Sequence, residues 1–266
     1  MNFDGKVIVV TGGGSGIGRQ LVLALLARGA KVAAVDIRSE NLEETASLAG
    51  AGTRLATFVV DVTDAGAVAG LPDKVIAALG TVDGYISNAG IIQPFVRLKD
   101  LDRATIDRVI DVNLYGTIHM ARAFIPHLLA RPEAHIANVS SMGGFLPVPG
   151  QTVYGAAKAG VKLLSEGLYA EMLGTEVGVS VILPGAIATD ITANSGVEVP
   201  VAADSGKEYR TTSAEDAARI ILDGIEKGRL HIFVGRDSRM MNLLTRLAPR
   251  RAAHLITKQM KDLLPS

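Results

Sequence analysis

A tyrosine and a lysine four residues apart are the plainest candidates for acid–base chemistry in this sequence. Tyr154 and Lys158 fall within a helix predicted over about residues 151–173, so their side chains would share one helix face. A free phenol has a pKa of about 10, and a neighbouring cation favours the phenolate and lowers that value. The pair could therefore move a proton, although the same spacing also occurs on ordinary helices.

Glycines cluster between the first predicted strand and the first predicted helix. Residues 6–11 form a β-branched run typical of a buried strand, and residues 16–28 have apolar side chains at helical spacing. Backbone N–H groups in such a loop can approach a pyrophosphate closely, at the positive end of the helix dipole. This context predicts dinucleotide binding. The candidate contacts in the loop are Gly12, Gly14, Ser15, Gly16, Ile17 and Gly18.

Asp36 and Arg38, at the end of the second predicted strand, bear on the choice of cofactor. Asp36 follows Gly18 by 18 residues, where a dinucleotide fold places an acid that accepts hydrogen bonds from the ribose hydroxyls. A carboxylate there would repel a 2′-phosphate, so NAD is favoured over NADP. Arg38 is close enough to weaken that preference and is a further candidate contact, although an ordinary exposed arginine is the simpler interpretation.

Strands alternate with helices along most of the chain. This alternation predicts βαβ units, whose right-handed crossovers build a parallel sheet. We therefore expect one α/β domain of the doubly wound Rossmann type, with seven parallel strands and helices on both faces. The predicted strands are residues 6–11, 31–36, 58–62, one that ends at 85–88, 135–140, 177–183 and 230–234. The predicted helices include 16–28, one capped by Ser39, one capped by Asp64, 101–129, 151–173 and one from Ser213 to Lys227.

Composition excludes several classes of protein. The 266 residues contain 48% hydrophobic side chains, enough for a sizeable core, and 27 basic against 27 acidic residues, without the basic excess of a nucleic-acid binder. The absence of cysteine excludes disulfides, cysteine-ligated metals and a thiol nucleophile, and the five scattered histidines indicate no metal site. The N-terminus lacks the pattern of a signal peptide, so we expect a cytoplasmic protein.

Short motifs continue in a fixed order from residue 6 to about residue 235. They are Thr11-Gly12…Gly16-Ile17-Gly18, Asp61-Val62, Asn88-Ala89-Gly90, Asn113, Ser141, Tyr154…Lys158 and Pro184-Gly185…Thr189. With these motifs the whole chain resembles the classical short-chain dehydrogenase/reductase family. The resemblance implies transfer of hydride between a nicotinamide cofactor and an alcohol or ketone.

The resemblance implies a role for each of four residues. Tyr154 would be the general acid/base that exchanges a proton with the substrate oxygen. Ser141, 13 residues earlier, would hydrogen-bond that oxygen, whereas its neighbour Ser140 has the wrong spacing. Lys158 would bind the nicotinamide ribose and lower the Tyr154 pKa. Asn113, a mediocre helix former in the middle of a predicted helix, would position a water in a proton relay.

The same resemblance implies further cofactor contacts at the carboxyl ends of the strands. Asp61 and Val62 would lie near the adenine, and Asn88, Ala89 and Gly90 near the adenosine ribose. Pro184, Gly185, Ile187 and Thr189 would border the nicotinamide.

The substrate pocket is less defined by the sequence. Its candidate residues are mostly apolar, which suggests an apolar or mixed secondary alcohol or ketone. About half of them could equally be core residues. The polar stretch at residues 189–212 is interpreted as a lid over the site. The pocket candidates are Gln93, Phe95, Ser141, Gly143, Phe145, Gln151 and Ile191, with Leu146 and Val148 as further possibilities.

The chain divides into a catalytic domain, residues 1–237, and a C-terminal extension, residues 238–266. Residues 227–262 hold nine basic and two acidic residues, and the extension has helical apolar stripes at Met240, Leu244 and Leu247 and at Ala252, Ile256, Met260 and Leu263. It could pack on its own fold or a sister subunit, shape the substrate entrance, or lie on an anionic membrane surface. We favour the first. Family resemblance also implies a homodimer or homotetramer.

The sequence therefore favours an NAD-dependent oxidoreductase acting on a secondary alcohol or ketone. A second enzymatic hypothesis is an NADPH-dependent 3-oxoacyl thioester reductase, against which Asp36 argues. A third hypothesis is a dinucleotide-binding regulator without turnover, against which the complete set of Ser141, Tyr154 and Lys158 argues. No metal is implied, and the substrate itself is left open.

Overall fold

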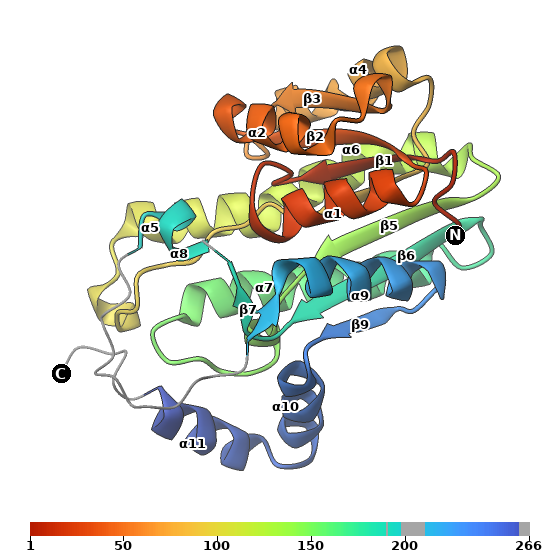
Figure 1. Ribbon diagram of the computed structural model, residues 1–266. Coiled ribbons are helices and arrows are strands. Elements are labelled where there is room, and N and C mark those ends of the chain that lie inside the picture. Colours follow the sequence, from red (N-terminus) through yellow and green to blue (C-terminus); the bar gives the residue numbers. More distant parts are fainter. Residues whose placement is uncertain (190, 198–210, 261–266) are drawn as a thin grey trace.

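Seven parallel strands form one sheet at the centre of the molecule (Figure 1). The computed structural model describes residues 1–189, 191–197 and 211–260. The strand order is β3-β2-β1-β4-β5-β6-β9, so the chain reverses direction across the sheet between β1 and β4. In open α/β sheets, ligands bind at the carboxyl ends of the strands beside such a reversal. The strands are β1 (Val7–Thr11), β2 (Lys31–Asp36), β3 (Leu55–Val59), β4 (Gly84–Ser87), β5 (Ala134–Val139), β6 (Val177–Pro184) and β9 (His231–Val234).

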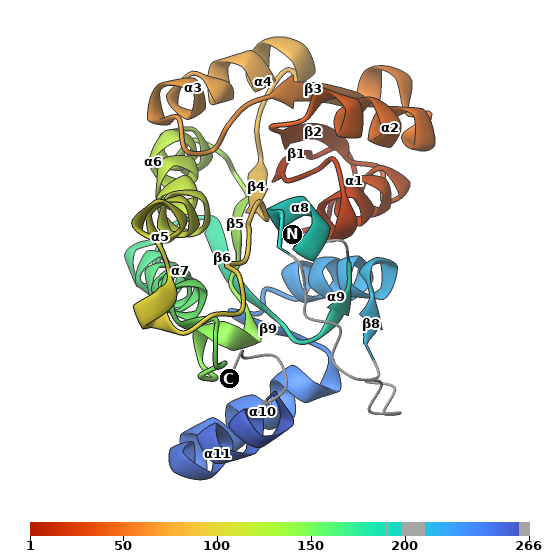
Figure 2. The same cartoon turned by 90° about the vertical axis from the view of Figure 1, so that its left-hand side faces the viewer.

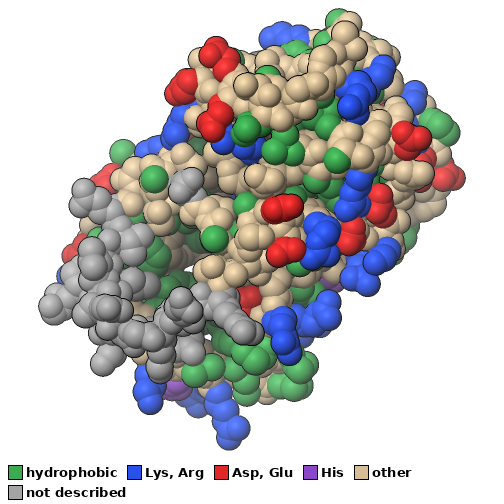
Figure 3. Space-filling view, in the orientation of Figure 1, with side chains coloured by type: hydrophobic (Ala, Val, Ile, Leu, Met, Phe, Trp, Pro, Cys, Tyr) green, Lys and Arg blue, Asp and Glu red, His purple; other side chains and the backbone are tan. Residues whose placement is uncertain are grey.

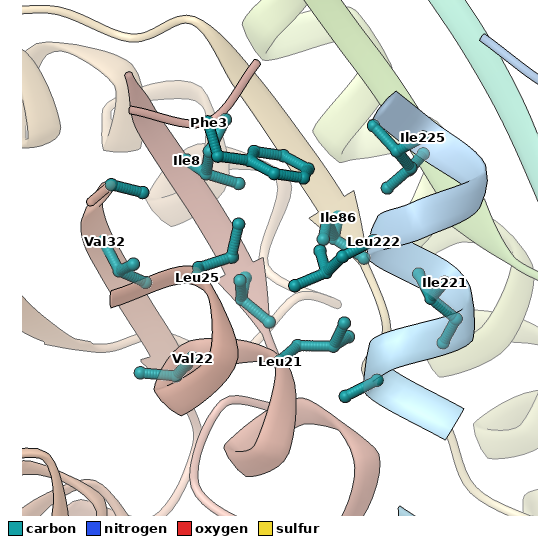
Figure 4. Close-up of a cluster of buried hydrophobic side chains, with 14 of the residues drawn as sticks. Phe3, Ile8, Leu21, Val22, Leu25, Val32, Ile86, Ile221, Leu222 and Ile225 are labelled. Carbon is teal, nitrogen blue, oxygen red and sulfur yellow. The ribbon is translucent and has the colours of Figure 1, made fainter. Parts of the chain in front are cut away.

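Three helices cover one face of the sheet: α1 (Gly16–Ala27), α2 (Ser39–Ala49) and α9 (Ala214–Glu226). Leu21 and Leu25 of α1 and Leu222 of α9 lie together over the β-branched side chains of β1 and β2, as Figure 4 shows. These residues recur at helical spacing, so each helix turns one apolar stripe toward the sheet.

The opposite face is covered by a second layer of helices (Figure 2). Val75, Met120, Phe124 and Leu168 are among its buried side chains, packed against the other side of the same strands. The expected doubly wound fold with helices on both faces is therefore confirmed. The helices of this layer are α3 (Ala65–Ala69), α4 (Leu71–Leu79), α5 (Arg103–Ile110), α6 (Gly116–Leu129) and α7 (Thr152–Glu171).

Two helix caps agree with the prediction and one does not. Asp64 accepts hydrogen bonds from two amides at the start of α3, and Ser213 accepts one from Asp216 at the start of α9. Ser39, however, is the first residue of α2, not its cap. Arg38 occupies the cap position in an extended conformation and provides no side-chain cap.

The third strand was predicted three residues too late. It runs over 55–59, not 58–62, and lies at the sheet edge, where its side chains are only partly buried. Val60 and Val62 are buried beyond the end of the ladder. Their apolar character therefore reflects packing at the end of the strand, which periodicity does not separate from the strand itself.

The helix predicted over 101–129 forms, with an interruption. It begins after Asp102, whose carboxylate accepts a hydrogen bond from the Thr105 amide. Residues 111–115 then make a π-helical turn before α6 continues the same axis. Such turns commonly accompany functional residues.

A short segment lies across the carboxyl edge of the sheet (Figure 2). It consists of β7 (Ile187–Ala188), which pairs with β8 (Thr212–Ser213), and the one-turn helix α8 (Ile191–Ser195). Of the predicted lid at 189–212, residues 190 and 198–210 lie outside the described residues.

The C-terminal extension forms a helical hairpin of α10 (Arg236–Leu247) and α11 (Pro249–Gln259). Met241, Ala252 and Ile256 pack against Leu146 of the main body. The predicted stripe on α10 was misplaced, because Met240 and Leu247 are exposed and Met241 with Leu244 faces inward. Leu263 lies outside the described residues. Across the described parts of the chain, no helix combines the length and hydrophobicity needed to cross a membrane.

Candidate active site

A cavity of about 650 Å³ opens at the carboxyl ends of β1, β2 and β4, beside the reversal of strand order. It brings together the two sequence signals for nucleotide binding, the glycine loop and Asp36. Its lining also contains predicted residues from three other segments. Those lining residues are Gly12, Ser15, Gly16, Ile17, Asp36, Arg38, Asp61, Val62, Asn88, Ala89, Gly90, Thr189 and Ile191.

The glycine loop is held tightly against the end of β2. Gly12 has a positive φ of 66°, and the Gly14 amide donates to Asp36 Oδ2 at 3.0 Å. A Cβ on Gly14 would come within 2.8 Å of that same oxygen, so the close approach of loop and carboxylate requires glycine. The contacts leave the second Asp36 oxygen, Oδ1, to accept from the Arg38 amide at 3.1 Å.

Two residues that the sequence analysis did not single out support this loop from behind. Thr45 of α2 is buried and donates to the Gly13 carbonyl oxygen at 3.1 Å. Arg19 of α1 donates to Thr45 Oγ1 at 3.1 Å and also to the Gly14 carbonyl oxygen. No pattern in the sequence indicated these two roles. Thr45 and Arg19 lie within ordinary helices, and their hydrogen-bond partners come from other segments of the chain.

Arg38 is not the freely solvated side chain of the simpler interpretation. Its guanidinium donates to the side-chain and backbone oxygens of Asn194 on α8, at 3.0 and 2.9 Å. Asn194 in turn donates to Ser15 Oγ at 3.2 Å. These bonds tie α8 to both the end of β2 and the glycine loop, across the mouth of the cavity.

The other end of the cavity approaches Lys158 and Asn113. A Cβ on Gly90 would lie 3.1 Å from Lys158 Nζ and 2.8 Å from Asn113 Oδ1, so the two polar groups converge over this glycine. Lys158 Nζ also donates to the Val139 carbonyl oxygen at 3.0 Å. The lysine is thus buried with its ammonium group fixed beside the ends of β4 and β5.

Asn113 occupies the π-helical turn of the α5–α6 helix. Its amide donates to the carbonyl oxygens of Ile91 and Val109, both at 2.9 Å. The widened turn lets a buried asparagine reach across to the segment after β4. The poor helix propensity of Asn113 was therefore a useful signal for the place where the helix departs from α geometry.

Tyr154 and Ser141 lie on either side of Gly143. A Cβ on Gly143 would be 3.4 Å from the Tyr154 ring and 3.5 Å from Ser141 Oγ. Ser141 Oγ accepts from the Gly143 amide at 3.0 Å, and Lys158 Nζ lies 5.9 Å from the Tyr154 ring centroid. Ser140 instead donates to the Lys158 carbonyl oxygen at 2.6 Å.

Burial shifts the pKa values of both members of the tyrosine–lysine pair. Removal from water raises the pKa of the Tyr154 phenol, and its hydrogen bond with Ser141 opposes that rise. Removal from water lowers the pKa of Lys158 to about 8. The pKa of Tyr154 is thus shifted upward, opposite to the lowering expected from the nearby lysine. A positive charge brought beside the phenol would favour the phenolate.

Gln93 has a different position from the one predicted. It is completely buried, and its Oε1 accepts from the amides of Val153 and Tyr154, both at 3.0 Å. Its Nε2 donates to the Gly150 carbonyl oxygen at 2.9 Å. These bonds satisfy the free amides at the start of α7. We therefore reassign Gln93 from the substrate pocket to the support of the helix that carries Tyr154.

The remaining pocket candidates are spread over several environments. Gln151 is buried and donates to the Gln93 carbonyl oxygen at 2.7 Å, so it belongs to the same support. Ile191 lines the cofactor-side cavity, and Leu146 is buried under the tail hairpin. Phe95, Gly143, Phe145 and Val148 are partly exposed and stay candidates for substrate contact.

Of the predicted nicotinamide contacts after β6, only Thr189 lines the cavity. The Gly185 amide donates to the Val234 carbonyl oxygen at 2.9 Å, and Pro184 ends β6. Ile187 lies in β7, and Thr189 approaches Gly16 across the cavity. Asp237, at the start of α10, accepts from the Ala186 amide at 2.8 Å and so fixes this segment.

Comparisons with known proteins agree with this geometry. A family model described as short chain dehydrogenase matches residues 6–199. A Mycobacterium tuberculosis protein named as an oxidoreductase, SadH, is 36% identical over 257 residues, which cover 92% of each chain.

Solved structures resemble the chain over nearly its full length. A Burkholderia phymatum short chain dehydrogenase/reductase in complex with NAD has a TM-score of 0.81 and 28% identity, over 93% of this chain and 96% of that one. A Burkholderia cenocepacia short chain dehydrogenase in complex with NADP has the same TM-score and 25% identity, over 96% and 99%.

Proposed function

The chain belongs to the short-chain dehydrogenase/reductase family, and from that premise we propose that it is an NAD-dependent oxidoreductase of secondary alcohols or the matching ketones. The convergence of Lys158 and Asn113 on Gly90, at one end of a cavity that holds Asp36 at the other, carries the proposal. Lys158 Nζ also lies 5.9 Å from the Tyr154 ring centroid, so the cavity adjoins the tyrosine–lysine pair.

The cavity suits an extended dinucleotide. Gly12, Gly16 and Asp36 line its wall, and Gly90 lies at the end that approaches Lys158. The glycine loop would hold the pyrophosphate at the start of α1. Lys158 would hold the nicotinamide ribose near Gly90. When bound, the nicotinamide supplies the two-electron acceptor or donor for the reaction.

The chain's own residues would handle the proton. In the oxidation direction, the Tyr154 phenolate takes the hydroxyl proton while the carbinol C–H bond breaks with loss of hydride, and a ketone forms. In reduction, the Tyr154 phenol returns that proton to the oxygen. Ser141 orients the substrate oxygen by a hydrogen bond. Lys158, while protonated, favours the phenolate, and Asn113 lies where it can fix a water that exchanges protons with the lysine.

Asp36 supports NAD over NADP. Its carboxylate would accept hydrogen bonds from the ribose hydroxyls and repel a 2′-phosphate. Arg38 keeps its positive charge, but its guanidinium is held by hydrogen bonds to the side-chain and backbone oxygens of Asn194. The same argument disfavours an NADPH-dependent 3-oxoacyl thioester reductase.

A spectrophotometric screen at 340 nm tests the proposal. Purified protein is offered NAD or NADP with cyclic, aryl and steroid secondary alcohols and with 3-hydroxyacyl thioesters, and the reduced cofactors with the matching ketones. We expect turnover with NAD on an alcohol class. Turnover of the thioesters with NADPH would favour the reductase alternative. Binding of NADH without turnover of any substrate would favour the non-catalytic regulator.

A homodimer or homotetramer in the cytoplasm is the proposed working form. The oligomeric state is supported by large apolar side chains that α7 exposes on the molecular surface. Leu163 is the most exposed of them.

A further inference from the structure

The tail hairpin has an outer face that packs against no described element. On α10, Arg239, Met240, Leu243, Arg246 and Leu247 follow each other at helical spacing and are all exposed. The exposed fractions of Met240, Leu243 and Leu247 are 62, 60 and 76%. An amphipathic helix that served only to cover the main body would not need large aliphatic groups on both of its faces.

The outer face is also strongly cationic. On α11, Arg250, Arg251 and Lys258 are exposed beside Leu255, and residues 238–258 contain no aspartate or glutamate. Figure 3 shows green and blue side chains together over the hairpin at the lower edge of the molecule. The outer face consists of Arg239, Met240, Leu243, Arg246, Leu247, Arg250, Arg251, Leu255 and Lys258.

The inner face fixes the hairpin in place. Met241 and Ile256 pack against Leu146, and Ser238 donates to the Leu183 carbonyl oxygen at 2.7 Å. The 3-10 turn Met142–Gly144, which directly follows Ser141, also contacts this cluster through Met142. The outer face is therefore presented by a packed element next to the candidate active site.

The charge of the outer face favours an anionic membrane over a second copy of this chain as its binding partner. A second copy of the chain, related by a twofold axis through the face, would bring arginines against arginines without an acid between residues 238 and 258 to pair with them. An anionic phospholipid surface offers the opposite charge, and its interfacial region accepts Met and Leu side chains.

We propose that the outer face of the tail hairpin docks the protein on anionic phospholipid membranes as a peripheral protein. The arginines would contact the headgroups, while Met240, Leu243 and Leu247 would enter the headgroup–acyl boundary. Each basic residue near an anionic surface contributes roughly a fivefold gain in partitioning. This inference concerns a different surface from the proposed reaction and does not depend on it.

Vesicle co-sedimentation of the full-length protein tests the proposal. The probes are phosphatidylcholine vesicles with and without about one third phosphatidylserine. We expect binding to the anionic vesicles only, weakened by salt. The double substitution Arg246→Glu and Arg250→Glu should reduce the partition coefficient at least tenfold. The control, Lys74→Glu with Lys99→Glu, makes the same change in net charge at exposed positions away from the hairpin and should bind like wild type.

A second pair of substitutions tests the aliphatic groups. Leu243→Ser with Leu247→Ser should weaken vesicle binding severalfold at physiological salt, with the circular dichroism spectrum and thermal midpoint of wild type. The proposal is overturned if wild type ignores anionic vesicles at low salt, or if the hairpin and control charge variants bind equally. It is also overturned if the serine variant binds vesicles normally but changes the oligomeric mass, because the face would then join subunits.

Discussion

Lys158 is a buried ammonium group bonded to a backbone carbonyl oxygen, and this costs the folded state free energy at neutral pH. Its pKa is lowered from 10.5 to about 8 in the folded protein. Between pH 8 and 10.5, the unfolded chain therefore binds more protons at this group than the folded one, and stability rises with pH across that window.

Substitution of Lys158 by methionine should remove this pH dependence. Between pH 7 and pH 9.5, the free energy of unfolding of wild type should gain about 2 kcal/mol relative to Lys158→Met, since each unit of pH contributes at most about 1.4 kcal/mol per proton. Urea denaturation of both proteins at the two pH values measures this difference. Equal changes in the two proteins would show that Lys158 is not desolvated in the folded state.

Asp36 is a second side chain with a proposed role that a single substitution can test. Asp36→Ala should lower the ratio of kcat/KM with NAD to kcat/KM with NADP at least tenfold, because the repulsion of a 2′-phosphate disappears. The matched control is Glu40→Ala, an exposed acid in the first turn of α2. Steady-state kinetics with both cofactors provides the measurement, and an unchanged ratio would remove Asp36 from this role.

At the level of elements, Gln93 connects the loop after β4 to α7, the helix that carries Tyr154. Its side chain accepts hydrogen bonds from the first free amides of α7. Gln93→Leu would leave the amides of Val153 and Tyr154 buried without an acceptor, at a cost of about 1–3 kcal/mol in stability. We also expect kcat to fall more than KM changes, because the start of α7 sets the position of Tyr154.

The conservative replacement Gln93→Glu separates positioning from general destabilisation. Burial at this position favours the protonated carboxyl group, whose carbonyl oxygen still accepts from both amides while its hydroxyl donates to the Gly150 carbonyl oxygen, so kcat should recover substantially. The readouts are kcat, KM and the thermal midpoint of the three proteins. A loss of stability in Gln93→Leu with unchanged kcat would contradict the positioning role.

The sequence predicted elements well where local signals decide them. Buried β-branched runs predicted β1, β2 and β6 closely, and the side chains of Asp64 and Ser213 marked true helix starts. The predicted position of β3 was wrong, because this edge strand is partly exposed. The more buried residues, Val60 and Val62, follow the strand. The role of Gln93 was also missed, because a cap supplied from 60 residues away leaves no local pattern.

At the level of the whole molecule, the candidate site combines residues marked by local patterns with residues that only tertiary contacts bring to it. The glycine loop and Asp36 follow neighbouring strands whose ends meet at one edge of the sheet, and Tyr154 and Lys158 share one face of α7, so local patterns revealed them. Supporting residues such as Thr45, Arg19 and Asn194 are set by tertiary contacts. The inward face of α10 depends on the body that it packs against, so periodicity alone placed its stripe incorrectly.

The exposed apolar side chains of α7 predict a subunit interface. Leu163, which is 70% exposed, lies on α7. If α7 pairs with a second copy, Leu163→Asp should place a charge in an apolar contact and shift the protein to a lower oligomeric mass. Leu48→Asp, on the exposed face of α2, is the control. Light scattering after size exclusion reports the mass, and identical masses for both variants and wild type would refute this interface.

The central claim is that Tyr154 transfers the substrate proton in an enzyme that binds NAD. Its most direct test compares wild type with Tyr154→Phe on the alcohol identified by the screen, together with NADH binding followed by fluorescence. We predict a loss of kcat/KM of at least about a hundredfold, the contribution typical of general acid–base catalysis, with NADH affinity retained. A variant that keeps the wild-type rate would contradict the assignment of the acid/base and the mechanism built on it.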